Sequence, residues 1–183
     1  MLIVKNDVFI TVEDINTFTE KLGIDLPEKY KFFLLKYNGG RTIKTKFRNS
    51  VNVRLLYPLK SENGYDLLTI INYENTEKII DLGFFPIGET EFGDYICIRI
   101  QDDNSIWLIT HDKYEKNKKL TDSFEEFVNE CNSEKIEHVS TMEERWERVR
   151  KAGNEDKITP EIVQAWQREI DRLSNIKQEE VLL

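Results

Sequence analysis

Apolar side chains in the first part of the chain recur at helical spacing. Ile15, Phe18 and Leu22 fall every three or four residues, which is the period of one face of an α-helix. Thr11 and Asp14 stand where a reciprocal capping pair belongs at the start of such a helix. The pattern therefore predicts a helix that begins after Thr11 and ends before the next glycine.

A second helix is predicted directly afterwards, from Pro27 to the turn Asn38-Gly39-Gly40. Proline suits the first turn of a helix because no partner is needed there for the N–H that it lacks. The residues expected on the inward face of this helix are Tyr30, Phe33, Leu34 and Tyr37.

The middle of the chain is rich in β-branched residues and alternates in part between apolar and polar positions, which is typical of strands. Turn residues such as Gly93-Asp94 separate the apolar runs. Strands so close in sequence, with no crossover helix between them, are expected to pair antiparallel. The predicted strands are 51–57, 84–87, 95–100 and 106–109.

Residues 41–48 place four basic side chains in eight positions, at Arg41, Lys44, Lys46 and Arg48. The alternation predicts an exposed edge strand or loop whose charges deter edge-to-edge aggregation. Contact with nucleic acid is the weaker alternative, because the rest of the chain is acidic.

Three further helices are predicted in the C-terminal part, starting near Asp122 and covering 140–152 and 159–173. Trp146 and Trp166 are expected to lie in the apolar seam of a hairpin formed by the last two helices. The predicted domains are residues 1–138 and a C-terminal helical hairpin extension over 139–183.

Composition and charge narrow the possible partners. The 183 residues are 39% hydrophobic and 33% charged, with a formal net charge of -8. Residues 1–138 hold 24 acidic and 18 basic residues, against ten and eight in the remainder. Such a surface repels phosphate and argues against sequence-independent nucleic-acid binding. It favours a basic protein partner instead.

The sequence predicts a cytoplasmic protein without a metal, a cofactor or a membrane segment. Its start lacks the pattern of a signal peptide, and no run of apolar residues is long enough to cross a bilayer. Cys97 and Cys131 are far apart and have no metal-ligand spacing, so we expect reduced, buried thiols. Gly88 and Gly93 do not form a phosphate-binding loop.

Two groups of residues could carry chemistry. His111 and Asp112 could act as a base and its orienting carboxylate in a small hydrolase, although a strand-end histidine bonded to a loop is the simpler interpretation. Five carboxylates near the predicted turns could be solvated turn residues, a catalytic pair, or a negative patch that attracts a cationic protein. These five are Glu89, Glu91, Asp94, Asp102 and Asp103.

Four motifs occur in a familiar order. The first is LPEKY (residues 26–30), followed by Asn38-Gly39-Gly40, and the second is FPIG (85–88) with FGDYIC (92–97). SIWL (105–108) with His111-Asp112 and SFEEF (123–127) complete the series. Together they resemble the signature of the SUKH superfamily over about residues 10–131. The helical tail and residues 59–82 match nothing diagnostic in it.

The resemblance implies an α+β fold with a mostly antiparallel sheet and helices packed on one side, here with a C-terminal helical extension. Many bacterial SUKH proteins are immunity proteins that neutralise polymorphic toxins, often nucleases, and fungal relatives regulate cell-wall glucan synthesis as interaction hubs. No catalytic residues are carried over from the family.

We therefore predict a non-enzymatic immunity protein that occludes a toxin domain, with a nuclease as its expected partner. The five carboxylates would meet the Lys and Arg side chains that a nuclease uses on phosphate. The alternative is a regulatory interaction module that binds cellular proteins through its sheet or its tail. The oligomeric state stays open.

Overall fold

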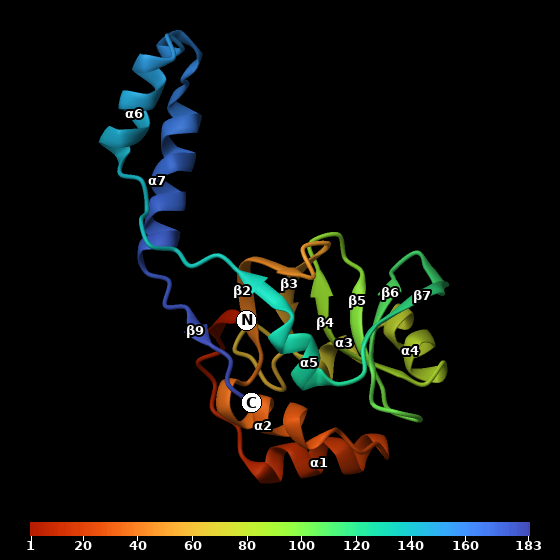
Figure 1. Cartoon of the computed structure of the whole chain (residues 1–183). Coiled ribbons are helices and arrows are strands. Elements are labelled where there is room, and N and C mark those ends of the chain that lie inside the picture. The colour runs from red at the N-terminus through yellow and green to blue at the C-terminus, as the bar shows by residue number, and fades with distance from the viewer. The chain divides into compact units, whose positions relative to one another are not determined.

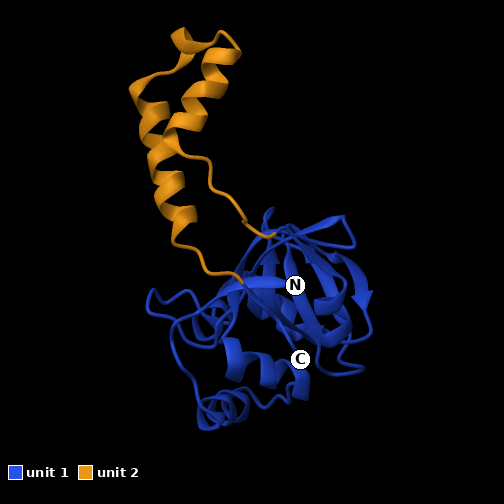
Figure 2. Ribbon diagram, turned by 60° about the vertical axis from the view of Figure 1, so that its left-hand side comes forward, with its two compact units in different colours: residues 1–134, 179–183 blue, residues 135–178 orange.

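The computed structural model describes all 183 residues and divides them into two compact units. Unit 1 comprises residues 1–134 with 179–183, and unit 2 comprises residues 135–178 (Figure 2). Unit 2 is thus inserted between two segments of unit 1. The last five residues were predicted to belong to the helical extension, but β9 (Glu179–Glu180) pairs with β1 (Leu2–Lys5) and Val181 is buried. This pairing places the C-terminus in unit 1.

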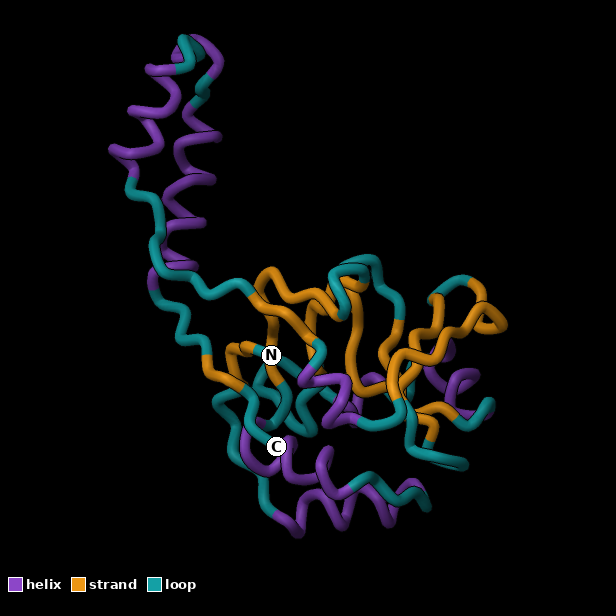
Figure 3. The backbone as a smooth tube through the Cα atoms, in the orientation of Figure 1, coloured by secondary structure: helices purple, strands orange, loops and turns teal.

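Unit 1 is built on a nine-stranded antiparallel sheet (Figures 1 and 3). The strands follow the order β7-β6-β5-β4-β3-β2-β1-β9, and β8 pairs with β2. The predicted α+β class with an antiparallel sheet is confirmed. The remaining strands are β2 (Gly40–Phe47), β3 (Val51–Leu56), β4 (Phe84–Thr90), β5 (Tyr95–Arg99), β6 (Ile106–Thr110), β7 (Lys113–Thr121) and β8 (Cys131–Ser133).

The main core lies between one face of this sheet and four helices. The helices are α1 (Val12–Leu22), α2 (Glu28–Tyr37), α3 (Leu67–Ile70) and α5 (Phe124–Asn129). Tyr30 and Phe33 of α2 pack their rings 5.1 and 5.3 Å from that of Phe124. The predicted capping pair is present, since Thr11 and Asp14 each accept a backbone hydrogen bond from the other.

One helix, α4 (Glu74–Asp81), packs on the opposite face of the sheet. Its Ile79 joins Phe84, Cys97 and Ile109 in a second, smaller core. Along β5, Ile96 and Ile98 belong to the main core, whereas Cys97 between them belongs to the smaller one. Successive side chains of a strand point to opposite faces of the sheet, which explains this division. The end of the sheet around β4–β6 is therefore covered on both faces.

The basic segment 41–48 is an interior strand, so its interpretation as an exposed edge strand or loop was wrong. β2 pairs with β3 on one side and with β1 and β8 on the other. Arg41 and Lys46 are exposed whereas Thr45 and Phe47 are buried. The alternation of basic and buried residues thus arises because one face of this antiparallel strand is solvated and the other is packed on the core.

Unit 2 is a helical hairpin of α6 (Met142–Lys151), the 3-10 turn η1 (Glu155–Lys157) and α7 (Pro160–Ser174). The rings of Trp146 and Trp166 meet edge to face at 5.7 Å, which confirms the predicted seam. Arg145 adds an ion pair to Glu169 at 2.7 Å. No residue of unit 2 is fully buried. Neither unit contains a helix long and apolar enough to cross a membrane.

Candidate interaction site at the β4–β5 turn

The turn between β4 and β5 is held by a dense set of hydrogen bonds. The Thr90 N–H donates to the Asp94 carbonyl (2.9 Å), and the Gly93 N–H donates back to the Thr90 carbonyl (3.1 Å). The Thr90 hydroxyl oxygen also accepts from the backbone N–H groups of Phe92 and Asp94. Gly93 has a φ of 85°, where a side chain would be strained. The turn is therefore rigid.

His111 braces the same turn from the β6–β7 connection. Its Nδ1 lies 2.9 Å from the Asp94 carboxylate, and its backbone N–H donates to the same oxygen at 3.2 Å. Asp94, and not Asp112, is thus the carboxylate that orients His111. The contact explains His111 as the strand-end histidine bonded to a loop that the sequence suggested.

Phe92 stands at the tip of this braced turn and is 73% exposed. An exposed phenyl ring on a rigid backbone loses little conformational entropy when it binds a partner. Aromatic side chains of this kind are enriched in the buried centres of protein interfaces. Phe92 is absent from the predicted site residues. Its sequence signal is that of a large apolar residue inside an acidic turn, outside the alternation of either strand.

Glu89 is buried at 6% exposure and belongs to the interior of unit 1. Its carboxylate accepts hydrogen bonds from Tyr57 Oη (3.0 Å) and Tyr65 Oη (2.8 Å), and Arg54 Nη1 lies 3.1 Å away. Burial, and to a smaller extent the hydrogen bond to Glu89, raises the pKa of Tyr65 to about 12. Both tyrosines donate to Oε2, whereas Oε1 makes the ion pair with Arg54 but has no hydrogen bond. The contacts offset most of the cost of the buried charge and give Glu89 a structural role.

Asp102 and Asp103 lie in the β5–β6 turn, at the other end of β5 from Asp94. A five-residue strand spans about 16 Å, so the five predicted acids form two groups rather than one patch. Asp102 pairs with Arg99 at 3.4 Å, and Asp103 pairs with Lys119 at 3.0 Å. Hydrogen bonds from Ser105 and Lys119 hold the pKa of Asp103 well below its usual range.

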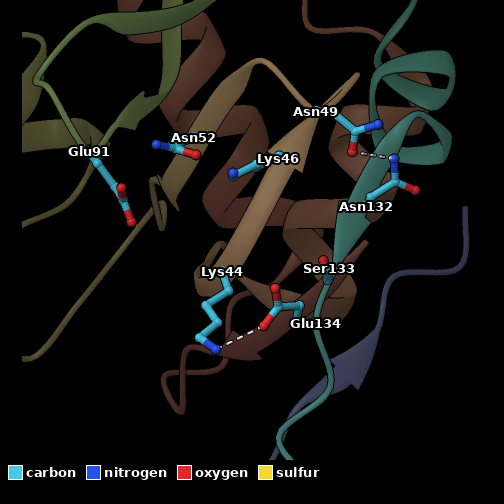
Figure 4. Close-up of a pocket in the computed structure, with 8 residues that line it drawn as sticks. All are labelled: Lys44, Lys46, Asn49, Asn52, Glu91, Asn132, Ser133 and Glu134. Atoms are coloured by element: carbon cyan, nitrogen blue, oxygen red, sulfur yellow. Dashed lines mark hydrogen bonds and ion pairs between the residues drawn. The ribbon is translucent and has the colours of Figure 1, made fainter.

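A polar hollow of about 540 Å³ adjoins the β4–β5 turn (Figure 4). Glu91 lines it and has no ion pair, while its backbone N–H donates to the Asn52 carbonyl of β3 at 3.2 Å. Lys44 and Glu134 point toward each other across a 2.8 Å ion pair. The lining residues are Lys44, Lys46, Asn49, Asn52, Glu91, Asn132, Ser133 and Glu134.

All eight side chains that line this hollow are polar or charged, whereas small-molecule sites are lined mainly by hydrophobic and aromatic side chains. An exposed aromatic ring with polar side chains around it instead matches the aromatic centre and polar rim of a protein interface. We refer to Phe92, Glu91 and this hollow together as the turn surface.

The fold is that of an α+β protein whose β4–β5 turn is held by hydrogen bonds from β3 and from the β6–β7 connection. Residues 10–130 match the SMI1 / KNR4 family (SUKH-1). The match covers well over half of the chain, and the protein belongs to this family. No curated protein and no solved structure matches the chain.

Proposed function

We propose that the protein is an immunity protein that binds a polymorphic toxin domain with nuclease activity and blocks it by occlusion, without catalysis of its own. Membership of the SMI1 / KNR4 family (SUKH-1) supports the proposal, since many bacterial SUKH proteins have this role. The observation that carries it is the turn surface, where Phe92 projects from a rigid turn beside a polar hollow.

Charge supports a basic partner. Unit 2 contains nine acidic and nine basic residues, so the whole net charge of -8 resides in unit 1. A nuclease carries cationic groups for phosphate, and opposite fields speed its encounter with an acidic protein. Among the predicted acids, Glu91 is the exposed residue without an ion pair at the turn surface. Asp94, Asp102 and Asp103 would contribute mainly to the long-range field.

The proposal is tested by coexpression with the toxin domain encoded beside the gene. Cell survival and recovery of a stable complex are scored together. Survival with a complex is the expected result. Survival without a complex would contradict occlusion, and neither survival nor a complex would contradict immunity itself.

Phe92→Ala locates the interface. A central aromatic anchor contributes about 2 kcal/mol or more, so we expect Kd to rise about 30-fold. Phe9→Ala is the matched control, because Phe9 is a second exposed phenylalanine (95%), placed just before α1. An unchanged Kd for Phe92→Ala would remove the turn surface from the proposal.

A regulatory interaction module is the second candidate, and an exposed apolar cluster favours it. The exposed apolar residues Val12, Phe32 and Leu35 of α1 and α2 line a hollow of about 360 Å³. Phe9, which is also exposed, lies three residues before α1. Exposed apolar clusters of this kind mark interaction sites. A partner that is lost with Phe9→Ala and retained with Phe92→Ala would favour this function.

A further inference from the structure

The hairpin of unit 2 leaves one side of its apolar stripe open. Ile162, Val163, Trp166, Ile170 and Leu173 share one face of α7, and all five stay partly exposed despite the contact with α6. A stripe this wide is typical of a helix that packs against more than one neighbour. Two helices alone cannot enclose it.

Unit 2 is also too small to provide a core of its own. It has 44 residues and no fully buried side chain, and units of about this size usually need an additional source of stability. The chain continues from the two ends of unit 2 into β8 and β9, which belong to unit 1. A second apolar hairpin would supply the core that unit 2 lacks.

The charges of α6 indicate what covers the stripe. Glu143 and Arg150 lie seven residues apart and therefore on the same side of α6, flanking its apolar positions. Neither makes an ion pair within the chain, whereas Arg145, Glu147 and Lys151 all do. An acidic start and a basic end on one flank make α6 complementary to an antiparallel copy of itself.

We propose that unit 2 binds a second copy of this chain, so that two hairpins pack face to face into a four-helix bundle. Two-fold symmetry then places Glu143 of each copy opposite Arg150 of the other, giving the charge contact twice. Trp146 and Trp166 enter the shared core. Unit 2 has no net charge, so two hairpins do not repel each other, and a basic toxin domain finds no net attraction there.

The test is the mass of the full chain in solution, measured by sedimentation and light scattering. We expect about 43 kDa, twice the 21.7 kDa of one chain, with dissociation on dilution. Glu143→Arg and Arg150→Glu each place like charges together in both symmetric contacts, and each should raise the dimer Kd at least tenfold. The double variant Glu143→Arg/Arg150→Glu, and an equimolar mixture of the two single variants, should restore the dimer.

Arg168→Glu is the matched control. Arg168 is exposed on the side of α7 opposite its apolar stripe, and its reversal should leave the dimer unchanged. All three substituted positions are exposed, and far-UV circular dichroism checks that the helices persist. A monomeric full chain would overturn the proposal, as would single variants that dimerise like the parent. Toxin neutralisation is scored separately, so failure of the dimer leaves the immunity proposal intact.

Discussion

The two units use the same local helix signals but differ in what those helices bury. Helix α1 begins with the Thr11–Asp14 capping box, and α6 begins with the equivalent Thr141–Glu144 box. Unit 1 then buries its apolar faces against a sheet, whereas unit 2 leaves every side chain at least partly exposed. Capping and periodicity thus specify where helices form, and burial decides whether they are stable without a partner.

The largest contrast is expected from removing one aromatic ring in each unit. Phe33 is fully buried against Tyr30, Tyr37 and Phe124, so Phe33→Ala should cost about 3–5 kcal/mol of unfolding free energy. Trp166→Ala should cost unit 1 less than about 1 kcal/mol, because Trp166 belongs to unit 2, where its ring packs against that of Trp146. Urea denaturation followed by circular dichroism measures both. Equal losses would mean that the units unfold as one.

Two glycines provide the next comparison. A Cβ at Gly88 would lie 2.4 Å from the Leu55 carbonyl oxygen, so Gly88→Ala should force strands β3 and β4 apart and cost about 2–3 kcal/mol. Gly153, with a φ of 64° and open space around it, should cost about 1 kcal/mol when changed to Ala. Thermal unfolding separates the two. A larger loss at Gly153 would contradict the assignment of tight packing to unit 1.

Two glutamates of the predicted acidic set should behave differently. Glu89→Gln leaves Tyr57, Tyr65 and Arg54 with an uncharged acceptor inside unit 1, and we expect a loss of about 1–3 kcal/mol. Glu91→Gln should change stability by less than about 0.5 kcal/mol and act on toxin association instead. Chemical denaturation and binding kinetics are measured on both variants. A stability loss at Glu91 alone would reverse the two assigned roles.

The smallest effect concerns acid pH. Hydrogen bonds from Lys60 and then Thr11 lower the pKa of Asp14 to about 2. Because the pKa of Asp14 is lower in the folded than in the unfolded state, the ionised carboxylate stabilises the fold. This stabilisation is complete above about pH 4 and is lost as the pH falls toward 2. Asp14→Asn should therefore flatten the acid dependence of the urea midpoint between these pH values. Identical pH profiles for parent and variant would exclude the carboxylate as a source of that dependence.

The sequence predicted α1, α2 and α5 of unit 1 and the strands that contain β-branched runs, but it missed α3 although Asp66 caps that helix. It missed β7, because Lys113–Thr121 is mostly charged and forms an edge of the sheet with little burial. It missed α4 since residues 59–82 follow no familiar motif. β9 has only two residues, and its pairing with β1 at the other end of the chain leaves no local signal.

The candidate site was less predictable than the fold. The acidic residues were found from composition, but their roles depend on long-range contacts. Glu89 is internal because tyrosines 32 and 24 residues away donate to it, and the acids at the two ends of β5 separate because the strand is extended. Phe92 gains its importance from a turn geometry that propensity alone does not specify.

The most direct test of the account is hydrogen–deuterium exchange of the full chain with and without the neighbouring toxin domain. We predict new protection in the β4–β5 turn, residues 90–95, and in the β2–β3 hairpin that lines the hollow. Helices α6 and α7 should show none beyond that of the free protein. Protection confined to α1 and α2, or to the hairpin of unit 2, would contradict the turn surface as the toxin-binding site.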